Sequence, residues 1–228
     1  MTRHHGLSGL LALMLSALGA AAVHAQDEQP EASTRTSWDA TVARGATRLI
    51  SFTTDEGSSL SIDVAPDGWI VFDLLGHIWR LPAEGGAAQS LTQSSGVALN
   101  YHPSVSPDGR LIAFVSDRTG QNNLWVMSAD GTDPRIVHRD DNARVLTPTW
   151  TPDGEYIVVR RQPSGPGASS NAGGLWMLHR DGGQGVQILD DNSAHWPSVS
   201  SDGRYVYYHV RSASPSSSAA ASTTTRIA

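Results

Sequence analysis

The sequence contains no cysteine and no lysine among its 228 residues, and only 17% of the residues are charged. A chain without cysteine forms no disulfide framework, no thiolate metal site and no catalytic thiol. A chain without lysine has no Walker-type phosphate loop and no Schiff-base lysine. The 16 basic residues are therefore all arginine, and 22 acidic residues outnumber them to give a net charge of −6. Because phosphate binding needs clustered positive charge, we expect no nucleic-acid partner.

Long apolar runs are also scarce, and the one that stands out is at the N-terminus. Arg3 precedes a charge-free run over residues 7–23, which ends in the small-residue pattern Val-His-Ala at Ala25. This arrangement is typical of a secretory signal peptide. The alternative, a retained anchor, is disfavoured because a membrane span needs ~20 apolar residues. We predict a signal peptide over 1–25, a polar segment over 26–46, and an exported protein, periplasmic or secreted, with no membrane span after cleavage.

An internal repeat occupies most of the remaining chain. Three anchors recur in register: an Asp-Gly turn that follows proline in three of its four copies, an Ile-Trp or Leu-Trp pair, and a glycine turn six residues after each of these tryptophans. Three anchors in phase are hard to obtain by chance, so we expect the turn aspartates and the tryptophans to be structural. The turns are Asp67-Gly68, Asp108-Gly109, Asp153-Gly154 and Asp202-Gly203, and the tryptophans are Trp79, Trp125 and Trp176.

Each unit is predicted to form four short strands. Proline and glycine suit a type I turn at the first anchor. The strand after it, as in residues 111–115, is apolar on both faces and therefore needs cover on both faces. A four-stranded unit of about 40 to 50 residues is typical of a propeller blade. We predict an all-β fold, a β-propeller of about three and a half blades over residues 47–211, with units near 60–92, 101–138, 147–189 and 196–210.

The ring is expected to be incomplete. The fourth unit lacks a Trp strand, and the Ser/Ala/Thr-rich segment 212–228 is predicted to be disordered because it has too few core-forming residues. Open sheet edges would remain, and residues 48–52 are a candidate outer strand for closing a ring. Two alternatives stay open: the chain is a fragment of a six- or seven-bladed ring, or it assembles with another chain.

The repeats resemble those of the TolB-like, Pro-Asp-Gly-containing β-propeller family over residues 47–210. The phrase Phe-Asp-Leu-Leu-Gly-His-Ile-Trp-Arg at residues 72–80, and residues 98–131, are most similar to the N-terminal propellers of exported amidohydrolase-type proteins. The resemblance implies an exported, non-catalytic module for binding and interaction. Its alternative implication is a truncated N-terminal propeller of a secreted metal-dependent amidohydrolase whose catalytic domain is absent from this chain.

Blade geometry predicts which loops bind a partner. Loops from the second to the third strand and from blade to blade share one face, and their variable lengths on a rigid scaffold favour binding. We expect a protein, peptide or glycan on this variable-loop face; the alternative is that these loops are only solvated hairpins. The candidate residues are Arg118, Gln121, Asn122 and Asn123, the acidic pairs Asp140-Asp141 and Asp190-Asp191, and His102 and His195 near the axis.

No catalytic motif is present. The sequence lacks His-x-His, His-Glu-x-x-His and Gly-x-Ser-x-Gly, the patterns of zinc and serine hydrolases. The repeated Asp-Asp-Asn triplets have no calcium-loop spacing, so turn chemistry is the simpler explanation for them. We therefore expect no catalytic residue, no cofactor and no metal ligand in this chain.

Overall fold

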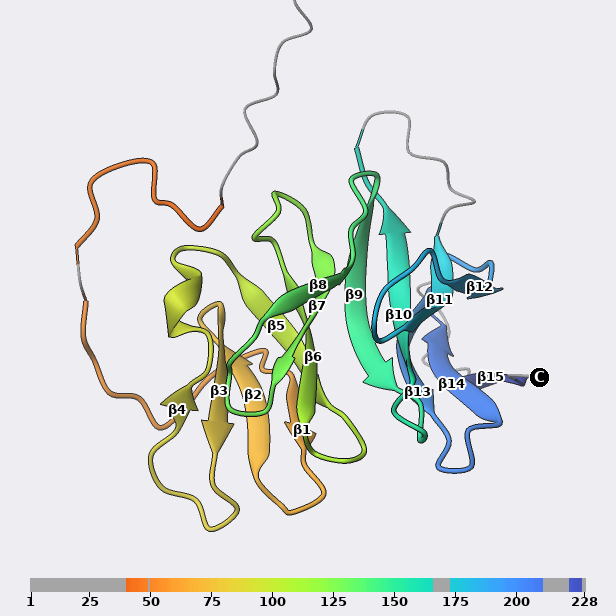
Figure 1. The fold of residues 1–228 in the computed structure, drawn as a ribbon, viewed down its shortest axis with the longest axis horizontal. Coiled ribbons are helices and arrows are strands. Elements are labelled where there is room, and N and C mark those ends of the chain that lie inside the picture. The colour runs from red at the N-terminus through yellow and green to blue at the C-terminus, as the bar shows by residue number, and fades with distance from the viewer. Residues whose placement is uncertain (1–39, 49, 166–172, 211–221, 227–228) are drawn as a thin grey trace, which may run out of the picture. The chain divides into compact units, whose positions relative to one another are not determined.

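The computed structural model describes residues 40–48, 50–165, 173–210 and 222–226, all within the compact unit Ser37–Ala228. The described residues form four antiparallel sheets, which confirms the all-β propeller class, and these sheets do not close a ring (Figure 1). No helix in these ranges is long and apolar enough to cross a membrane. The predicted signal peptide and most of residues 26–46 lie outside the described residues.

The strands follow one another in chain order within each sheet. The first sheet contains β1 (Ile62–Val64), β2 (Ile70–Leu74), β3 (His77–Leu81) and β4 (Gln89–Ser90). A short 3-10 helix, η1 (Gln93–Ser95), leads to the second sheet of β5 (Asn100–Val105), β6 (Leu111–Ser116), β7 (Asn123–Ser128) and β8 (Arg135–His138). The third sheet contains β9 (Ala143–Trp150), β10 (Tyr156–Pro163), β11 (Gly174–His179) and β12 (Val186–Leu189). The fourth contains β13 (Ala194–Val199), β14 (Tyr205–Val210) and β15 (Ser222–Arg226).

Side-chain hydrogen bonds hold the repeated turns between the first two strands of a sheet. Asp108 accepts a hydrogen bond of 2.6 Å from the Ser106 hydroxyl and one of 3.0 Å from the Arg110 N–H. These bonds favour the charged carboxylate and lower the pKa of Asp108. Asp153 and Asp202 repeat the arrangement with a hydroxyl two residues before each of them.

The first turn departs from this pattern. Alanine stands at position 65, where the other turns have a hydroxyl residue. The Ala65 N–H donates to the Trp69 carbonyl, four residues on, whereas the Ser106 N–H donates to Leu111, five residues on. The first turn is therefore one residue shorter, so Ile70 and Phe72 correspond to Ile112 and Phe114 of β6.

The apolar cores lie between successive sheets. Ile112 and Phe114 of β6 belong to the core shared with the first sheet, whereas Ala113 belongs to the core shared with the third. All three side chains are fully buried. Since successive side chains of a strand point to opposite faces, β6 contributes to two cores at once, which explains why its sequence is apolar on both faces.

Three inner strands carry the same irregularity. His102, Thr147 and Trp196 each have a positive φ, near 50°, and each precedes a proline. At each site two residues of the inner strand oppose one residue of the next strand, which is a β-bulge. A bulge redirects side chains, and here it lies within each of the inner strands β5, β9 and β13.

The fourth sheet corrects the prediction for the tail. Residues 212–228 were expected to be disordered, but Ser222–Arg226 pairs antiparallel with β14. An edge strand needs backbone hydrogen bonds and β-branched residues more than core side chains. The threonines of this segment meet that requirement on the otherwise open edge of β14, which composition alone does not reveal.

The expected closing strand at residues 48–52 is not formed among its described residues. Ile50 and Phe52 are each 63% exposed. The strand β10 continues to Pro163, and residues 166–172 lie outside the described residues.

Candidate functional site

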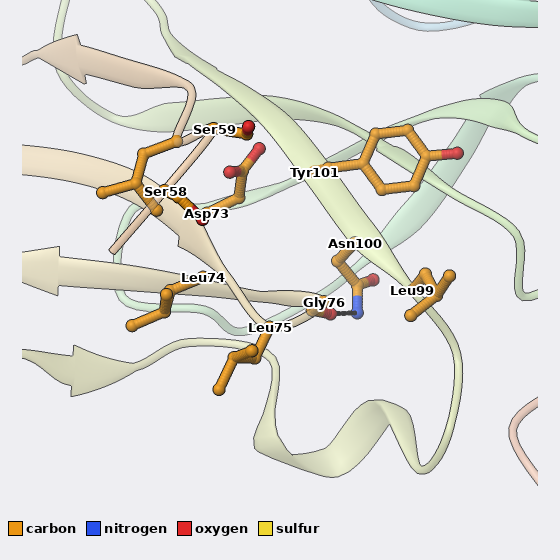
Figure 2. Close-up of a pocket in the computed structure, with 10 residues that line it drawn as sticks. Ser58, Ser59, Asp73, Leu74, Leu75, Gly76, Leu99, Asn100 and Tyr101 are labelled. Carbon is orange, nitrogen blue, oxygen red and sulfur yellow. Dashed lines mark hydrogen bonds between the residues drawn. The ribbon is translucent and has the colours of Figure 1, made fainter. Parts of the chain in front are cut away.

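A pocket of about 230 Å³ opens where the first sheet meets the second, on the predicted variable-loop side. One wall is the turn Leu74-Leu75-Gly76 between β2 and β3, and the other is the entry into β5 at Leu99 and Asn100 (Figure 2). The Asn100 N–H donates to the Gly76 carbonyl at 2.9 Å. This bond holds the two walls together, so the pocket depends on the contact between neighbouring sheets.

Asp73 supplies a buried carboxylate to the pocket, and its side chain joins β2 to β5 and to the residue before β1. Its Oδ1 accepts a hydrogen bond of 3.0 Å from the Ser61 N–H, and its Oδ2 accepts one of 2.7 Å from the His102 N–H. Ser58 and Ser59 line the same pocket. The polar part of the site is therefore organised by backbone donors before any ligand arrives.

The rim of the pocket is apolar. Leu75 and Leu99, which line it, are 70% and 51% exposed, and Val97 in the loop before Leu99 is 52% exposed. A Cβ at Gly76, whose φ is +80°, would lie 2.7 Å from a methyl group of Leu99. The positive φ favours glycine at this position, and the turn lies directly against the Leu99 side chain.

Asn100 connects the pocket to the predicted ligand residue Arg118. Its buried amide NH2 lies within 3.1 Å of the Gly76 and Ala98 carbonyls and of the Ser95 hydroxyl. Its Oδ1 accepts a hydrogen bond of 3.1 Å from Arg118. Burial lowers the pKa of the Arg118 guanidinium. Arg118 also lies over the Phe114 and Trp125 rings, so it is a packed residue rather than a free loop cation.

An aromatic cluster adjoins the pocket at the start of the inner strands. Tyr101 lines the pocket and makes an edge contact with His102, at 5.2 Å between ring centroids. His102 in turn contacts Trp196 of the fourth sheet at 5.6 Å. Burial, with a smaller contribution from Asp117, raises the pKa of Tyr101 to about 12. Burial lowers the pKa of His102 although Asp73 opposes the shift, so neutral forms of both rings are favoured.

Trp196 is the exposed member of this cluster, with 59% of its surface accessible. Its positive φ comes from the bulge in β13. The neighbouring candidate His195 is half-buried and lies opposite His209 of β14 in the strand pairing. The structure therefore places His102 beside the pocket and against the exposed Trp196. His195 instead takes part in the pairing between β13 and β14.

The candidate loop residues after Arg118 gather near the third sheet. Gln121 donates a hydrogen bond of 2.6 Å to the Ser164 hydroxyl, and the Asn122 carbonyl accepts one from the Val145 N–H. Asn123 is fully buried, and its Oδ1 accepts from the Asp140 N–H at 2.8 Å. The polar groups of these residues therefore connect loops of this chain.

The two acidic pairs differ in role. Asp140 is buried, forms an ion pair with Arg161, and accepts the N–H groups of Asn142 and Ala143. Asp141 is exposed, and among the described residues its carboxylate forms an ion pair with Arg139, at 3.3 Å. Asp140 is therefore a structural residue.

In the second pair it is the later aspartate that organises the turn. Asp191 accepts hydrogen bonds from the N–H and hydroxyl of Ser193, which lower its pKa. Asp190 lies 3.4 Å from the Gln187 amide. Across the described ranges, no group of three or more His, Asp or Glu side chains is placed to hold a metal ion.

Sequence reasoning missed the pocket itself. Asp73, Leu75, Leu99 and Tyr101 were not among the predicted residues, which were polar or charged residues of the variable loops and histidines near the axis. An available signal was the apolar pair at positions 74–75 within a turn, next to a glycine. Exposed leucines in loops on one side of a fold are a better indication of a binding surface than polar residues that loops need for their own hydrogen bonds.

The family described as the tricorn protease N-terminal beta propeller domain matches residues 61–219. The chain belongs to this propeller family. The TolB-like resemblance is confirmed as well: the Tol-Pal system protein TolB of Wolinella succinogenes is 26% identical over 165 residues, which cover 68% of this chain and 37% of that protein.

Other relatives match shorter segments of this propeller. An uncharacterized peptidase, YuxL of Bacillus subtilis, is 38% identical over 84 residues, which cover 36% of this chain and 12% of the peptidase. The tricorn protease homolog 1 of Streptomyces coelicolor is 30% identical over 95 residues, 41% of this chain and 9% of that protein. The chain thus spans less than half the length of these curated relatives.

Solved structures agree on the fold. A putative TolB from Agrobacterium tumefaciens has a TM-score of 0.57 at 21% identity, covering 69% of this chain and 56% of that one. TolB from Acinetobacter baumannii has the same TM-score at 17% identity, covering 74% of this chain and 41% of that one. At these identities the likeness concerns the propeller architecture of the family.

Proposed function

We propose that this propeller is an exported, non-catalytic module that binds a protein or peptide segment on its variable-loop face. The observation that carries the proposal is the pair of exposed leucines, Leu75 and Leu99, that line a pocket with a buried carboxylate. An aliphatic or aromatic side chain of the ligand enters between the two leucines. The exposed Trp196 extends the same surface, and tryptophan is enriched where proteins bind partners.

Selection of a random linear peptide library on the purified chain tests the binding role. Burial of one leucine contributes about 1.5–3 kcal/mol, so Leu99→Ser weakens the selected peptides about tenfold or more. Val186→Ser is the matched control, because Val186 is 60% exposed on β12. Selection that yields no binder, or binding that Leu99→Ser and Val186→Ser affect equally, contradicts the proposal.

Export is supported by the N-terminal sequence pattern and by similarity to TolB, a protein named for the Tol-Pal system. Expression of the complete coding sequence in a Gram-negative host, followed by fractionation and N-terminal sequencing, tests it. We expect periplasmic protein that begins at Gln26. Cytoplasmic protein that retains Met1 contradicts export.

A second candidate function is the front propeller of a larger hydrolase. It is favoured by two relatives named as a peptidase and a protease, and by the family description itself. As part of such a hydrolase, the propeller would present substrate to a catalytic domain. The resemblance of the repeats suggests that this domain is of the metal-dependent amidohydrolase type. The gene sequence downstream of codon 211 tests this candidate. Another reading frame that continues with further blades and then a His-x-His motif supports it, and a gene in which no frame continues in this way contradicts it.

A further inference from the structure

Each internal contact between sheets joins two different faces. We call the face that packs on the preceding sheet the rear face, and the face that packs on the following sheet the front face. Rear faces contribute pairs such as Ile112 and Phe114 of β6, or Val206 and Tyr208 of β14. Front faces contribute residues such as Ala113 of β6. This rear-to-front contact occurs three times in the described chain.

The rear face of the first sheet carries the same pattern without a covering sheet. Phe72 corresponds to Phe114 and lies opposite Ile62 and Trp79 in the strand pairing. Val64 lies opposite Ile70 on the same face. Ile62 and Val64 are 60% and 58% exposed, on the side of β1 opposite to Asp63, which accepts a hydrogen bond from β5 of the second sheet. An apolar sheet face of this kind needs a partner.

The front face of the fourth sheet is the other unmatched half. Tyr207 lies between Val206 and Tyr208, which both point into the core shared with the third sheet. Tyr207 therefore points the opposite way, and it is 45% exposed. Its partner across the sheet, Ser198, is exposed too. Tyrosine is suited to a surface that is wet in the free chain and buried in a complex, because it combines an apolar ring with a polar tip.

We propose that two copies of this chain associate head to tail, with the rear face of the first sheet of each copy packed on the front face of the fourth sheet of the other. Each copy offers one half of the contact at each end, so two copies satisfy both halves. A head-to-tail contact of this kind closes a ring when the rotation per subunit allows it. The ring then contains eight sheets, four from each copy, and the new contacts repeat the geometry of the internal ones.

Light scattering after size exclusion tests the proposal on protein expressed from the complete coding sequence. Wild type is expected to have twice the chain mass. Val64→Arg places a charge in the contact and is expected to halve that mass. Val186→Arg is the matched control at an equally exposed valine and keeps the doubled mass. Tyr207→Arg, at the opposite end, is expected to be monomeric as well. Circular dichroism spectra check that each variant remains folded.

Mixing the two monomeric variants separates head-to-tail association from a contact between like faces. Val64→Arg retains a normal fourth sheet, and Tyr207→Arg retains a normal first sheet, so one intact contact forms and the mixture regains the two-chain mass. A monomeric wild type, a wild-type mass above two chains, a Val64→Arg variant that stays dimeric, or a mixture that stays monomeric overturns the proposal. Peptide binding is measured separately on the monomeric variants. Failure of the two-copy association therefore does not imply failure of the proposed peptide binding, and the reverse holds too.

Discussion

The carboxylate of Asp63, on the first sheet, accepts a hydrogen bond of 2.8 Å from the N–H of Val105, on the inner strand of the second sheet. The same oxygen accepts one of 3.1 Å from the Ser104 hydroxyl. Both donors belong to buried residues. Successive sheets are thus joined by specific polar bonds in addition to their apolar cores.

Removal of this acceptor is predicted to weaken the contact between the two sheets. In Asp63→Ala the buried N–H of Val105 has no partner, which costs about 1–3 kcal/mol of unfolding free energy. Urea unfolding followed by tryptophan fluorescence measures the change. Asp55→Ala, at an exposed position before the first strand, is the control and is expected to leave the midpoint unchanged. Equal midpoints for the two variants contradict this account.

The adjacent aspartates 140 and 141 are predicted to differ sharply. Asp140→Ala leaves Arg161 without its buried partner and is expected to cost about 3–5 kcal/mol. Asp141→Ala removes an exposed ion pair with Arg139, worth less than about 1 kcal/mol. Thermal unfolding of the two variants measures both changes. A larger loss for Asp141→Ala is incompatible with the structure.

Two phenylalanines provide a similar contrast for the apolar core. Phe114 is fully buried between the first and second sheets, whereas Phe52 is 63% exposed. Phe114→Ala is expected to cost about 3–5 kcal/mol, because it removes buried surface and leaves a cavity. Phe52→Ala is expected to change stability little. Chemical denaturation of both variants is the measurement, and comparable losses argue against a core between the sheets.

The turn aspartates predict a loss of stability in acid. Hydrogen bonds from Ser200 and Arg204 lower the pKa of Asp202 to about 2, below the ~3.9 of an unfolded chain. A lowered pKa means that the folded state favours the charged carboxylate. Its contribution is therefore fully present above the unfolded pKa and is lost as the pH falls through about 2.

Unfolding measured from neutral pH down to about pH 2 tests this contribution. The difference in stability between wild type and Asp202→Asn is expected to be constant at neutral pH and to close in acid. Asp108 and Asp153 also have a lowered pKa, so wild type itself loses stability over the same range. A difference that widens in acid contradicts the sign of the effect.

The repeat made most of the fold predictable. The turn at Asp108 is held by hydrogen bonds from Ser106 and Arg110, which are close to it in sequence. The apolar pattern on both faces of residues 111–115 requires a sheet on each side. The shorter first turn was not predictable from the Asp-Gly spacing, because the deletion lies after Gly68 and shows only in the hydrogen-bond register. The strand at Ser222–Arg226 was missed since its stability depends on the partner edge of β14.

The candidate site was less predictable. Loop residues such as Arg118 and Asp140 have the composition of a binding surface, but tertiary contacts use them internally. The pocket arises from residues 74–76 and 99–101, which are brought together by sheet packing rather than by sequence proximity. The repeated X-Pro pairs at His102, Thr147 and Trp196 were visible in the sequence, yet their positive φ and the resulting bulges required the structure.

Hydrogen exchange resolved by peptide mass spectrometry tests the stacking of sheets most directly. Leu111–Ser116 of β6 has a sheet on each side, so its amides are expected to be among the slowest to exchange. Ile62–Val64 of β1, at the uncovered face, is expected to exchange much faster. Amides of β6 that exchange as fast as those of β1 would contradict the stacked arrangement.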